Sequence, residues 1–302
     1  MSEEFYPRGT EMASKHGLSG QFKGIITGAS SGIGKAMALE LARKYQARLV
    51  LNARSEEQLE VTCKAVEEAG GKAIKVVGDV SEEWVTDAAV NTCLESFGGV
   101  DVLVNNAGLA KPGTIMKLTV EDWQHVFAVN FFAPLRLTYG VLPHFIESGK
   151  GKIVNISSVA GKISFPGSVC YAASKFALTG MSEGMAAELA SKNIDIITVC
   201  PGWVRTEFFD KNNVSKLKNP TSIGNRKDLQ GFLMRSFLSI TSEECSAEVV
   251  KAMEKGGSQE IILTHPGKIF ERLAGVCPPA VFALAKRLPS ELVDSSETHD
   301  KN

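Results

Sequence analysis

Thr27-Gly28-Ala29-Ser30-Ser31-Gly32-Ile33-Gly34 is the stretch of sequence that decides the fold of this chain. An apolar run, Gly24-Ile25-Ile26, comes directly before it, and an amphipathic run over 35–42 follows it. A strand, a glycine turn and a helix in this order form the setting in which closely spaced glycines bind a nucleotide. The spacing is G-x-x-x-G-x-G rather than the commoner G-x-G-x-x-G. A Gly/Ser turn before a helix also occurs with nothing bound.

Each glycine of the turn has its own expected role. Gly28 allows the tight turn out of the strand, and Gly32 lets the backbone approach a pyrophosphate. Gly34 lets the helix pack close to the sheet, while the free N–H groups at the helix start face the anion. The candidate cofactor-binding residues of the turn are therefore Gly28, Ser30, Ser31, Gly32, Ile33 and Gly34.

Length and composition limit the classes of protein to which the chain can belong. It has 302 residues, 44% hydrophobic and 22% charged, which is typical of a globular protein with a sizeable core. Lys and Arg number 33 and Asp and Glu 34, and the resulting net charge of −1 gives no support for nucleic-acid binding. The first twenty residues are polar and lack an apolar core, so no signal peptide is predicted.

The cysteines and histidines show no metal-ligand spacing. The six cysteines include no C-x-x-C pair, and the five histidines are equally dispersed, so we expect no metal site. Most of the cysteines lie in apolar runs and are expected to be reduced, packed thiols of a cytoplasmic protein. They are Cys63, Cys93, Cys170, Cys200, Cys245 and Cys277.

Apolar runs rich in Val and Ile alternate with helical patterns from Phe22 onward. The candidate strands are 24–27, 48–52, 73–77, 101–105, 152–157, 194–200 and 259–263, and the candidate helices are 33–45, 55–69, 81–97, 119–147, 168–192 and 244–255. Ser55 and Ser81 are the expected N-caps of the second and third helices. Strict alternation predicts an α/β fold with a doubly wound parallel sheet. We expect one domain over about 22–265, with a mobile leader, 1–21, and a tail, 266–302.

Charged residues after the second and third strands bear on the choice of dinucleotide. A carboxylate at the end of the second strand holds a ribose 2′-OH, whereas an Arg accommodates a 2′-phosphate. The chain has Asn52-Ala53-Arg54 there, so Arg54 favours NADP(H) over NAD(H). A surface Arg before a helix is the alternative. Asp79, after the third strand, is either a contact for the adenine amino group or a carboxylate that only starts the next helix.

Polar residues also follow the fourth and fifth strands, where parallel sheets bind ligands. Asn105-Asn106-Ala107-Gly108 suits fixing of the loop by side chains and backbone approach to a ribose, although an ordinary Asn/Gly turn has the same composition. Ser158 follows the fifth strand. Tyr171 and Lys175 lie four residues apart, on one face of the next helix. We expect the Lys175 ammonium to lower the pKa of the Tyr171 phenol, which starts near ~10, so that the phenol exchanges protons near neutral pH.

Together these motifs resemble the short-chain dehydrogenase/reductase family over about residues 22–210. The resemblance implies a seven-stranded, Rossmann-like sheet. It implies that Tyr171 is the acid/base on the reacting oxygen, that Lys175 tunes it and binds the nicotinamide ribose, and that Ser158 binds the substrate oxygen. Asn130 would support a water-linked proton relay. NADP-preferring members often have a basic residue where this chain has Ser31. The further cofactor-binding residues that the resemblance implies are Val80, Asn106, Ala107, Gly108, Pro201, Gly202, Val204 and Thr206.

This resemblance favours an NADPH-dependent carbonyl reductase that converts a lipophilic ketone or aldehyde to an alcohol. Substrate choice is expected from 203–244, which is rich in aromatic and apolar residues; the alternative is that these side chains only pack a pair of helices. Two other functions stay open: a catalytically inactive nucleotide-sensing protein and an NAD-dependent alcohol dehydrogenase. The intact set of Ser158, Tyr171 and Lys175 favours an enzyme. We expect a small-molecule carbonyl substrate, no nucleic-acid partner, and a homo-oligomer, namely a dimer.

The tail has an apolar segment with basic flanks. Thirteen consecutive residues, 273–285, are uncharged, which is too few to span a bilayer, and Pro278-Pro279 interrupts any single helix. Two short amphipathic helices there would give a peripheral membrane contact of a cytoplasmic protein. The alternative is that this apolar face covers the substrate cleft or forms a subunit contact.

Overall fold

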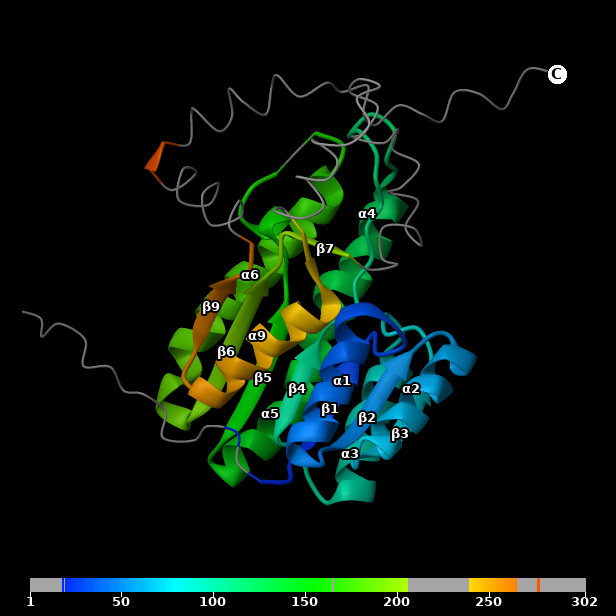
Figure 1. The fold of residues 1–302 in the computed structure, drawn as a ribbon. Helices are drawn as coiled ribbons and strands as arrows, with labels where there is room; N and C mark the ends of the chain where they lie inside the picture. Colours follow the sequence, from blue (N-terminus) through cyan, green and yellow to red (C-terminus); the bar gives the residue numbers. More distant parts are fainter. Residues whose placement is uncertain (1–17, 19, 165, 206–238, 265–275, 278–302) are drawn as a thin grey trace, which may run out of the picture.

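The computed structural model describes residues 18, 20–164, 166–205, 239–264 and 276–277. Seven strands form its main sheet: β1 (Lys23–Thr27), β2 (Arg48–Ala53), β3 (Lys72–Val77), β4 (Val102–Asn105), β5 (Gly151–Ile156), β6 (Ile194–Cys200) and β9 (Gln259–Ile262). They pair in the order β3-β2-β1-β4-β5-β6-β9, and every pair is parallel (Figure 1). The predicted doubly wound, seven-stranded parallel sheet is confirmed.

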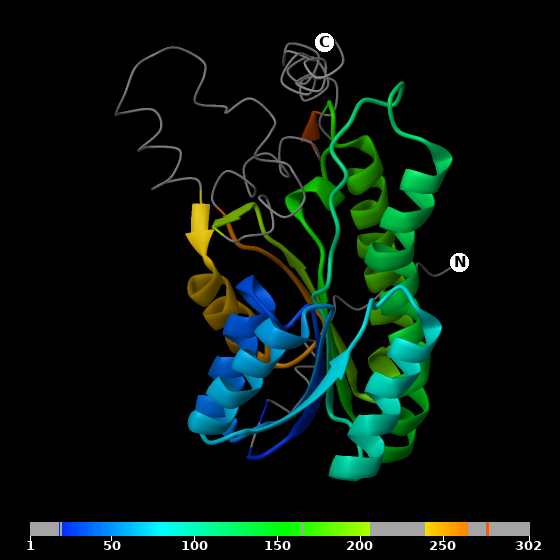
Figure 2. The ribbon, with the colours of Figure 1, turned by 90° about the vertical axis from the view of Figure 1, so that its right-hand side faces the viewer.

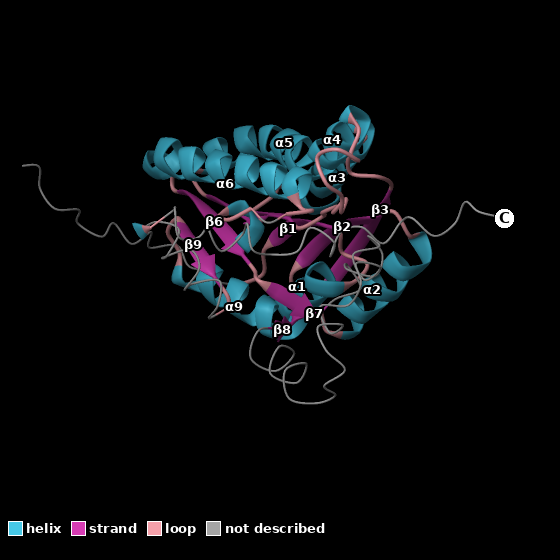
Figure 3. Ribbon diagram, turned by 90° about the horizontal axis from the view of Figure 1, so that it is seen from above, coloured by secondary structure: helices cyan, strands magenta, loops and turns pink. Residues whose placement is uncertain are grey.

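Helices cover both faces of this sheet, as Figure 2 shows edge-on and Figure 3 from above. The helices on one face are α1 (Gly32–Tyr45), α2 (Glu56–Glu68) and α9 (Ser242–Lys255). The helices on the other face are α3 (Glu83–Phe97), α4 (Val120–Phe127), α5 (Ala133–Ser148) and α6 (Val169–Leu189). Each face has its own buried apolar cluster, because successive strand side chains point to opposite faces. Burial on both faces explains why the strands are almost continuously apolar.

The order of the strands reverses between β1 and β4, because β1 pairs with β2 on one side and with β4 on the other. Ligands of open α/β sheets bind outside the carboxyl ends of the strands at such a point. The glycine turn follows β1, and Asn106 follows β4, so the fold brings two of the predicted motifs to this crevice.

The structure departs from the sequence predictions at two helices. Ser55 is the N-cap of α2, but Glu82 rather than Ser81 is the N-cap of α3. The Ser81 amide and hydroxyl both donate to the Asp79 carboxylate, at 2.9 and 2.7 Å, which holds Ser81 outside the helix. The predicted helix 119–147 contains a π-helical turn, η1 (Ala128–Phe132), between α4 and α5. By length and composition alone, the continuous helix Val120–Ser148 could cross a membrane. In this structure, however, 44% of its most apolar 18-residue stretch is buried against the rest of the protein.

Two short strands were not predicted. β7 (Trp203–Arg205) and β8 (Ser239–Thr241) pair in parallel in a separate sheet. Of the segment 203–244, the structure describes these two strands and the first three residues of α9. Residues 206–238 lie outside the described residues, as do nearly all of the leader 1–21 and of the tail 266–302. The expectations about a mobile leader, an amphipathic tail and the interior of the substrate segment therefore stay predictions.

A buried ion pair joins β5 and β6 at their amino ends, the end of the sheet away from the crevice. Lys152 and Asp195 are register partners, their side chains form the pair, and the residues are 7% and 5% exposed. Removing one partner of a buried pair is costly because the other charge stays buried without compensation.

We therefore expect Asp195→Ala to lower the free energy of unfolding by about 3–5 kcal/mol. Replacing both residues with apolar ones, as in Lys152→Met with Asp195→Leu, should restore most of this loss. Urea denaturation of both variants at pH 7 measures the difference. A loss below about 1 kcal/mol for Asp195→Ala, the size of an exposed pair, would contradict the buried character of this interaction.

Candidate active site

The glycine turn has the geometry that its sequence predicts. Gly28 and Gly32 have φ angles of 64° and 57°, a backbone region that favours glycine. A Cβ on Gly34 would lie 2.5 Å from both the carbonyl oxygen of Gly28 and the side-chain nitrogen of Asn106. Gly34 therefore has to be glycine for α1 to begin so close to β1. Ser30, Ser31 and Ile33 complete the turn and the first residues of α1, and all three are partly exposed.

The start of α1 has no capping hydrogen bond from the side chain of its N-cap residue, Ser31. The first N–H groups of a helix have no partners within the helix, and together with the helix dipole they favour an anion. The residues of this turn thus have the chemistry required to bind a phosphate group.

Hydrogen bonds join the glycine turn to the loop after β4. The Asn106 side chain donates to the carbonyl oxygens of Thr27 and Gly28 at 2.9 and 3.1 Å. In return, the Thr27 hydroxyl accepts from the backbone N–H groups of Asn106 and Ala107 at 3.1 and 3.0 Å. Asn106 therefore binds the backbone of the glycine turn and fixes it to the loop after β4. Ala107 and Gly108 continue this partly exposed loop at the crevice.

Thr27 was not singled out from the sequence as a site residue. It is the last residue of β1 and is 2% exposed, and its hydroxyl also donates to the carbonyl oxygen of Val104. A hydroxyl residue directly after the apolar run Gly24-Ile25-Ile26 was the available signal. Its partners, however, come from a strand far away in the sequence.

Arg54 and Asp79 lie next to each other at the outer end of the crevice. The Arg54 guanidinium is 3.8 Å from the Asp79 carboxylate, and its side chain is 69% exposed. Burial raises the pKa of Asp79, but the hydrogen bonds from Ser81 and the charge of Arg54 outweigh it and bring the pKa below its ordinary value. Arg54 thus provides an accessible positive charge after β2. Asp79 acts here as the turn-forming carboxylate, and its contact with adenine stays a prediction. Val80, next to it, is buried.

Ser158, Tyr171 and Lys175 meet at the carboxyl end of β5. Ser158 is the N-cap of the short helix η2 (Val159–Gly161), where its hydroxyl accepts from the backbone of Ala160 at 3.1 Å. The Ser158 hydroxyl also hydrogen-bonds the Tyr171 phenol. The Lys175 ammonium lies 5.9 Å from the centre of the Tyr171 ring and donates to the carbonyl oxygen of Ile156 at 2.8 Å. The fold therefore brings Ser158 to the helix that carries Tyr171 and Lys175.

Burial sets the protonation of this group, and one expectation about it was wrong. Burial raises the pKa of Tyr171 to about 12, although the hydrogen bond with Ser158 acts in the opposite direction. Burial also lowers the pKa of Lys175 to about 8, because this residue is only 3% exposed. The sequence predicted a lowered pKa for Tyr171. The desolvation of the phenol, which depends on tertiary packing, is the largest effect on its pKa and outweighs the hydrogen bond with Ser158.

Asn130 lies in the π-helical turn and is fully buried. Its side-chain oxygen accepts from the Leu109 amide at 2.8 Å, and its nitrogen donates to the Leu109 carbonyl at 2.8 Å and to the Ser174 hydroxyl at 2.9 Å. The structure therefore places Asn130 between the β4 loop and α6. Its role in a water-linked proton relay stays a prediction.

The remaining predicted residues follow β6. Pro201 is buried, and its carbonyl oxygen accepts from the backbone of Val159, next to Ser158. Gly202 packs so tightly against Thr264 that a Cβ at Gly202 would overlap the threonine side chain. Val204 is buried in β7. Thr206 lies outside the described residues. The loop after β6 thus adjoins Ser158, while contacts with a nicotinamide stay a prediction.

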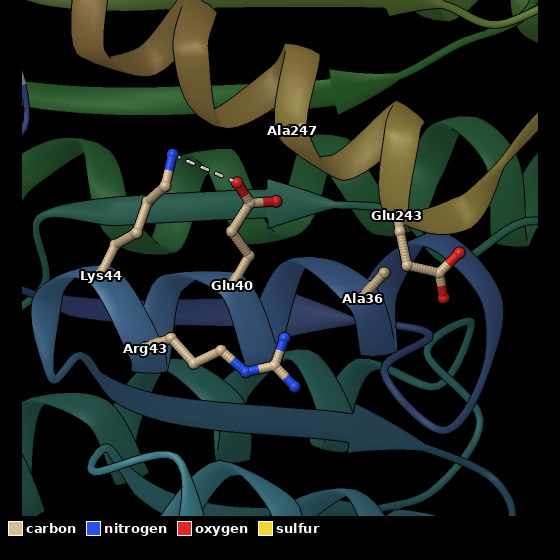
Figure 4. Close-up of a pocket in the computed structure, with 6 residues that line it drawn as sticks. All are labelled: Ala36, Glu40, Arg43, Lys44, Glu243 and Ala247. Carbon is tan, nitrogen blue, oxygen red and sulfur yellow. Dashed lines mark ion pairs between the residues drawn. The ribbon is translucent and has the colours of Figure 1, made fainter.

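Other features of the described residues lie elsewhere. A groove between α1 and α9 contains none of the predicted site residues; it is lined by Ala36, Glu40, Arg43, Lys44, Glu243 and Ala247 (Figure 4). Within the described ranges, no group of three or more His, Cys, Asp or Glu could hold a metal ion. The six thiols are free, and all except Cys277 are buried, as the apolar runs around them predict.

Known proteins resemble this chain in sequence and in fold. The ketoacyl reductase HetN of Nostoc sp. is 41% identical over 180 residues, which cover 60% of this chain and 62% of HetN. The L-sorbose reductase of Gluconobacter frateurii, whose crystal structure holds NADPH and L-sorbose, superposes with a TM-score of 0.71 at 30% identity. That match covers 82% of this chain and 96% of the reductase.

A second solved structure, a single-residue variant of actinorhodin polyketide ketoreductase with NADPH, has a TM-score of 0.73 at 30% identity. The match covers 82% of this chain and 96% of that protein. The family model for short chain dehydrogenases matches residues 24–216, which include the glycine turn, the β4 loop, Ser158, Tyr171 and Lys175. By sequence, fold and the arrangement of these residues, the chain belongs to the short-chain dehydrogenase family.

Proposed function

We propose that this protein reduces a ketone or aldehyde to an alcohol with NADPH, and that Tyr171 is the general acid. The observation that carries this proposal is the contact of Tyr171 with Ser158 and Lys175 at the carboxyl end of β5, beside the crevice between β1 and β4. Relatives described as ketoacyl, sorbose and polyketide ketoreductases support an oxidoreductase that acts on carbonyl groups.

The residues of the crevice fit a dinucleotide phosphate. Gly28 and Gly34 leave backbone where a Cβ would overlap neighbouring atoms, and the first turn of α1 offers its amides to the pyrophosphate. Arg54 would hold the 2′-phosphate that distinguishes NADPH from NADH. The two similar structures that contain NADPH support the same choice of cofactor. When bound, NADPH supplies the hydride that reduces the carbonyl carbon.

Residues of α6 and of the end of β5 would donate the proton to the substrate oxygen and recover it afterwards. Ser158 and the Tyr171 phenol donate hydrogen bonds to the carbonyl oxygen and orient it. As the carbon takes up the hydride, the phenol O–H bond breaks and its proton passes to that oxygen, which leaves an alcohol and a phenolate. The positive charge of Lys175 stabilises the phenolate, which then recovers a proton from solvent. Because the pKa of Lys175 is about 8, the side chain carries this charge at pH 7.

The finer features of the function rest on the sequence. The aromatic residues of 203–244 favour a lipophilic substrate, and only β7, β8 and the start of α9 are described in that segment. A dimeric state, a cytoplasmic location and a membrane contact through the tail are likewise proposals.

Tyr171→Phe is expected to lower kcat about 10²–10⁴-fold and to leave NADPH affinity within about twofold, because the phenol provides the proton and the crevice holds the cofactor. NADPH oxidation with a panel of lipophilic and polar ketones and aldehydes measures kcat, and protein fluorescence titration measures binding. If the variant keeps more than a tenth of the activity, Tyr171 is not the acid. If the wild-type protein binds NADPH but reduces no member of the panel, a nucleotide-sensing role gains support.

The wild-type protein is expected to prefer NADPH, and Ala53→Asp with Arg54→Gln should move this preference toward NADH. Loss of the charge-assisted contact should lower kcat/KM for NADPH about ten- to a hundredfold. Arg43→Gln removes an exposed positive charge from α1 and serves as the matched control, with no change expected. Equal use of both cofactors by the wild-type protein would contradict the role of Arg54.

The reduction should become slower as the pH rises through about 8. Lys175 has a pKa lowered to about 8, so it is charged below this pH and neutral above it, whereas Tyr171, with a pKa of about 12, keeps its proton. The pH profile of kcat/KM reports the free enzyme and is expected to be level near pH 6–7 and to fall above about pH 8. A profile that stays level to pH 10 would contradict the loss of an essential Lys175 charge near pH 8.

A further inference from the structure

Ser174 lies within the turn of α6 that carries Tyr171 and Lys175. It is fully buried, and its hydroxyl donates to the backbone carbonyl oxygen of Tyr171 at 2.7 Å. The same oxygen atom of the Ser174 hydroxyl accepts from the side-chain nitrogen of Asn130 at 2.9 Å. A serine in a helix often bonds a carbonyl one turn back, but a second, buried partner from another element ties that turn to the rest of the protein.

Asn130 extends this contact to the loop after β4. Its amide donates to the carbonyl oxygen of Leu109 and accepts from the N–H of Leu109, both at 2.8 Å. Leu109 directly follows Gly108 of the loop that supports the glycine turn. A continuous chain of hydrogen bonds therefore runs from this loop through Asn130 and Ser174 to the backbone of Tyr171.

Asn130 takes part in this chain of hydrogen bonds from the π-helical turn η1. A π turn inserts one residue into an α-helix and is often found at functional sites. In η1 it accompanies a fully buried Asn130 whose amide uses its oxygen and both hydrogens. Removal of the Ser174 hydroxyl would leave a hydrogen of this buried amide without a partner, which a protein interior strongly disfavours.

We propose that Ser174 is a positioning residue, which fixes the turn that carries Tyr171 relative to the β4 loop through Asn130. This inference rests on the proposed function, because it concerns the placement of the proton donor. Ser174 touches neither substrate nor cofactor in this role. A displacement of a catalytic group by about 1 Å can lower the rate about 10²-fold, so a small shift of this turn is enough to matter.

The same helix offers a matched control. Ser182 is also fully buried, and its hydroxyl donates to the carbonyl oxygen of Leu178 at 2.7 Å and accepts from the Asn155 side chain at 2.8 Å. Ser174→Ala and Ser182→Ala thus delete the same group from the same kind of contact. Only the first deletion affects the turn that carries Tyr171.

The kinetic experiment measures kcat of these variants at saturating NADPH and KM for NADPH from a separate titration of the cofactor. Ser174→Ala is expected to lower kcat about ten- to a hundredfold, to leave KM for NADPH within about twofold, and to increase the isotope effect with deuterated NADPH. Ser182→Ala should keep the wild-type kcat and isotope effect while its melting temperature falls by a similar amount. Ser174→Cys keeps the side-chain volume with a poor hydrogen-bonding group and replaces the alanine variant if that one does not fold. Equal kcat values for the Ser174 and Ser182 variants would overturn the proposal.

Hydrogen exchange of the Leu109 amide separates this inference from the proposed function. This amide donates to Asn130, so it is expected to exchange faster in Ser174→Ala and Ser174→Cys than in the wild type, and unchanged in Ser182→Ala. If the wild-type protein reduces no carbonyl compound, the proposed function fails, and this exchange still decides whether Ser174 holds the loop. Identical exchange in all variants shows that the chain of hydrogen bonds transmits nothing and overturns the inference.

Discussion

The hydrogen bonds between Asn106 and the glycine turn are the interaction on which the rest of the site depends. They join the ends of β1 and β4 where the order of the strands reverses, and they fix the turn from which α1 begins. The close approach of Gly34 to Gly28 and Asn106 leaves no room for a side chain. Only a glycine at this position lets α1 begin so close to the end of β1.

Burial is the second constraint, and it acts on the charges of the site. Lys175 is buried and Tyr171 is partly buried, so each favours its neutral form more than it would in solution. The lysine remains the easier of the two to charge near neutral pH. A proton donor requires a positive charge beside a neutral phenol, because this charge stabilises the phenolate that forms once the proton has left.

Polar contacts inside the protein fix the β4 loop beside the glycine turn relative to α6, which carries Tyr171 and Lys175. Asn130 and Ser174 connect the β4 loop to α6, and Thr27 connects the end of β1 to the same loop. Fully satisfied buried polar groups fix one arrangement, because any other leaves a donor without a partner. The site therefore depends on residues that never touch a ligand as well as on those that would.

The sequence by itself determined the alternation of strands and helices, the glycine turn, and the set of Ser158, Tyr171 and Lys175. Apolar runs, the spacing of glycines and the four-residue separation of Tyr171 and Lys175 are patterns within short stretches of sequence. The geometry of a single strand, turn or helix is enough to interpret them. Tertiary structure alone decided the rest. The sequence pattern over 119–147 is that of one continuous helix and gives no sign of the π turn at Asn130. Ser81 bonds the carboxylate of Asp79, and Glu82 is the N-cap of α3 instead. The pKa of Tyr171 rises instead of falling, because burial removes water from the phenol. This desolvation depends on all the groups packed around the side chain, which the sequence near Tyr171 does not reveal.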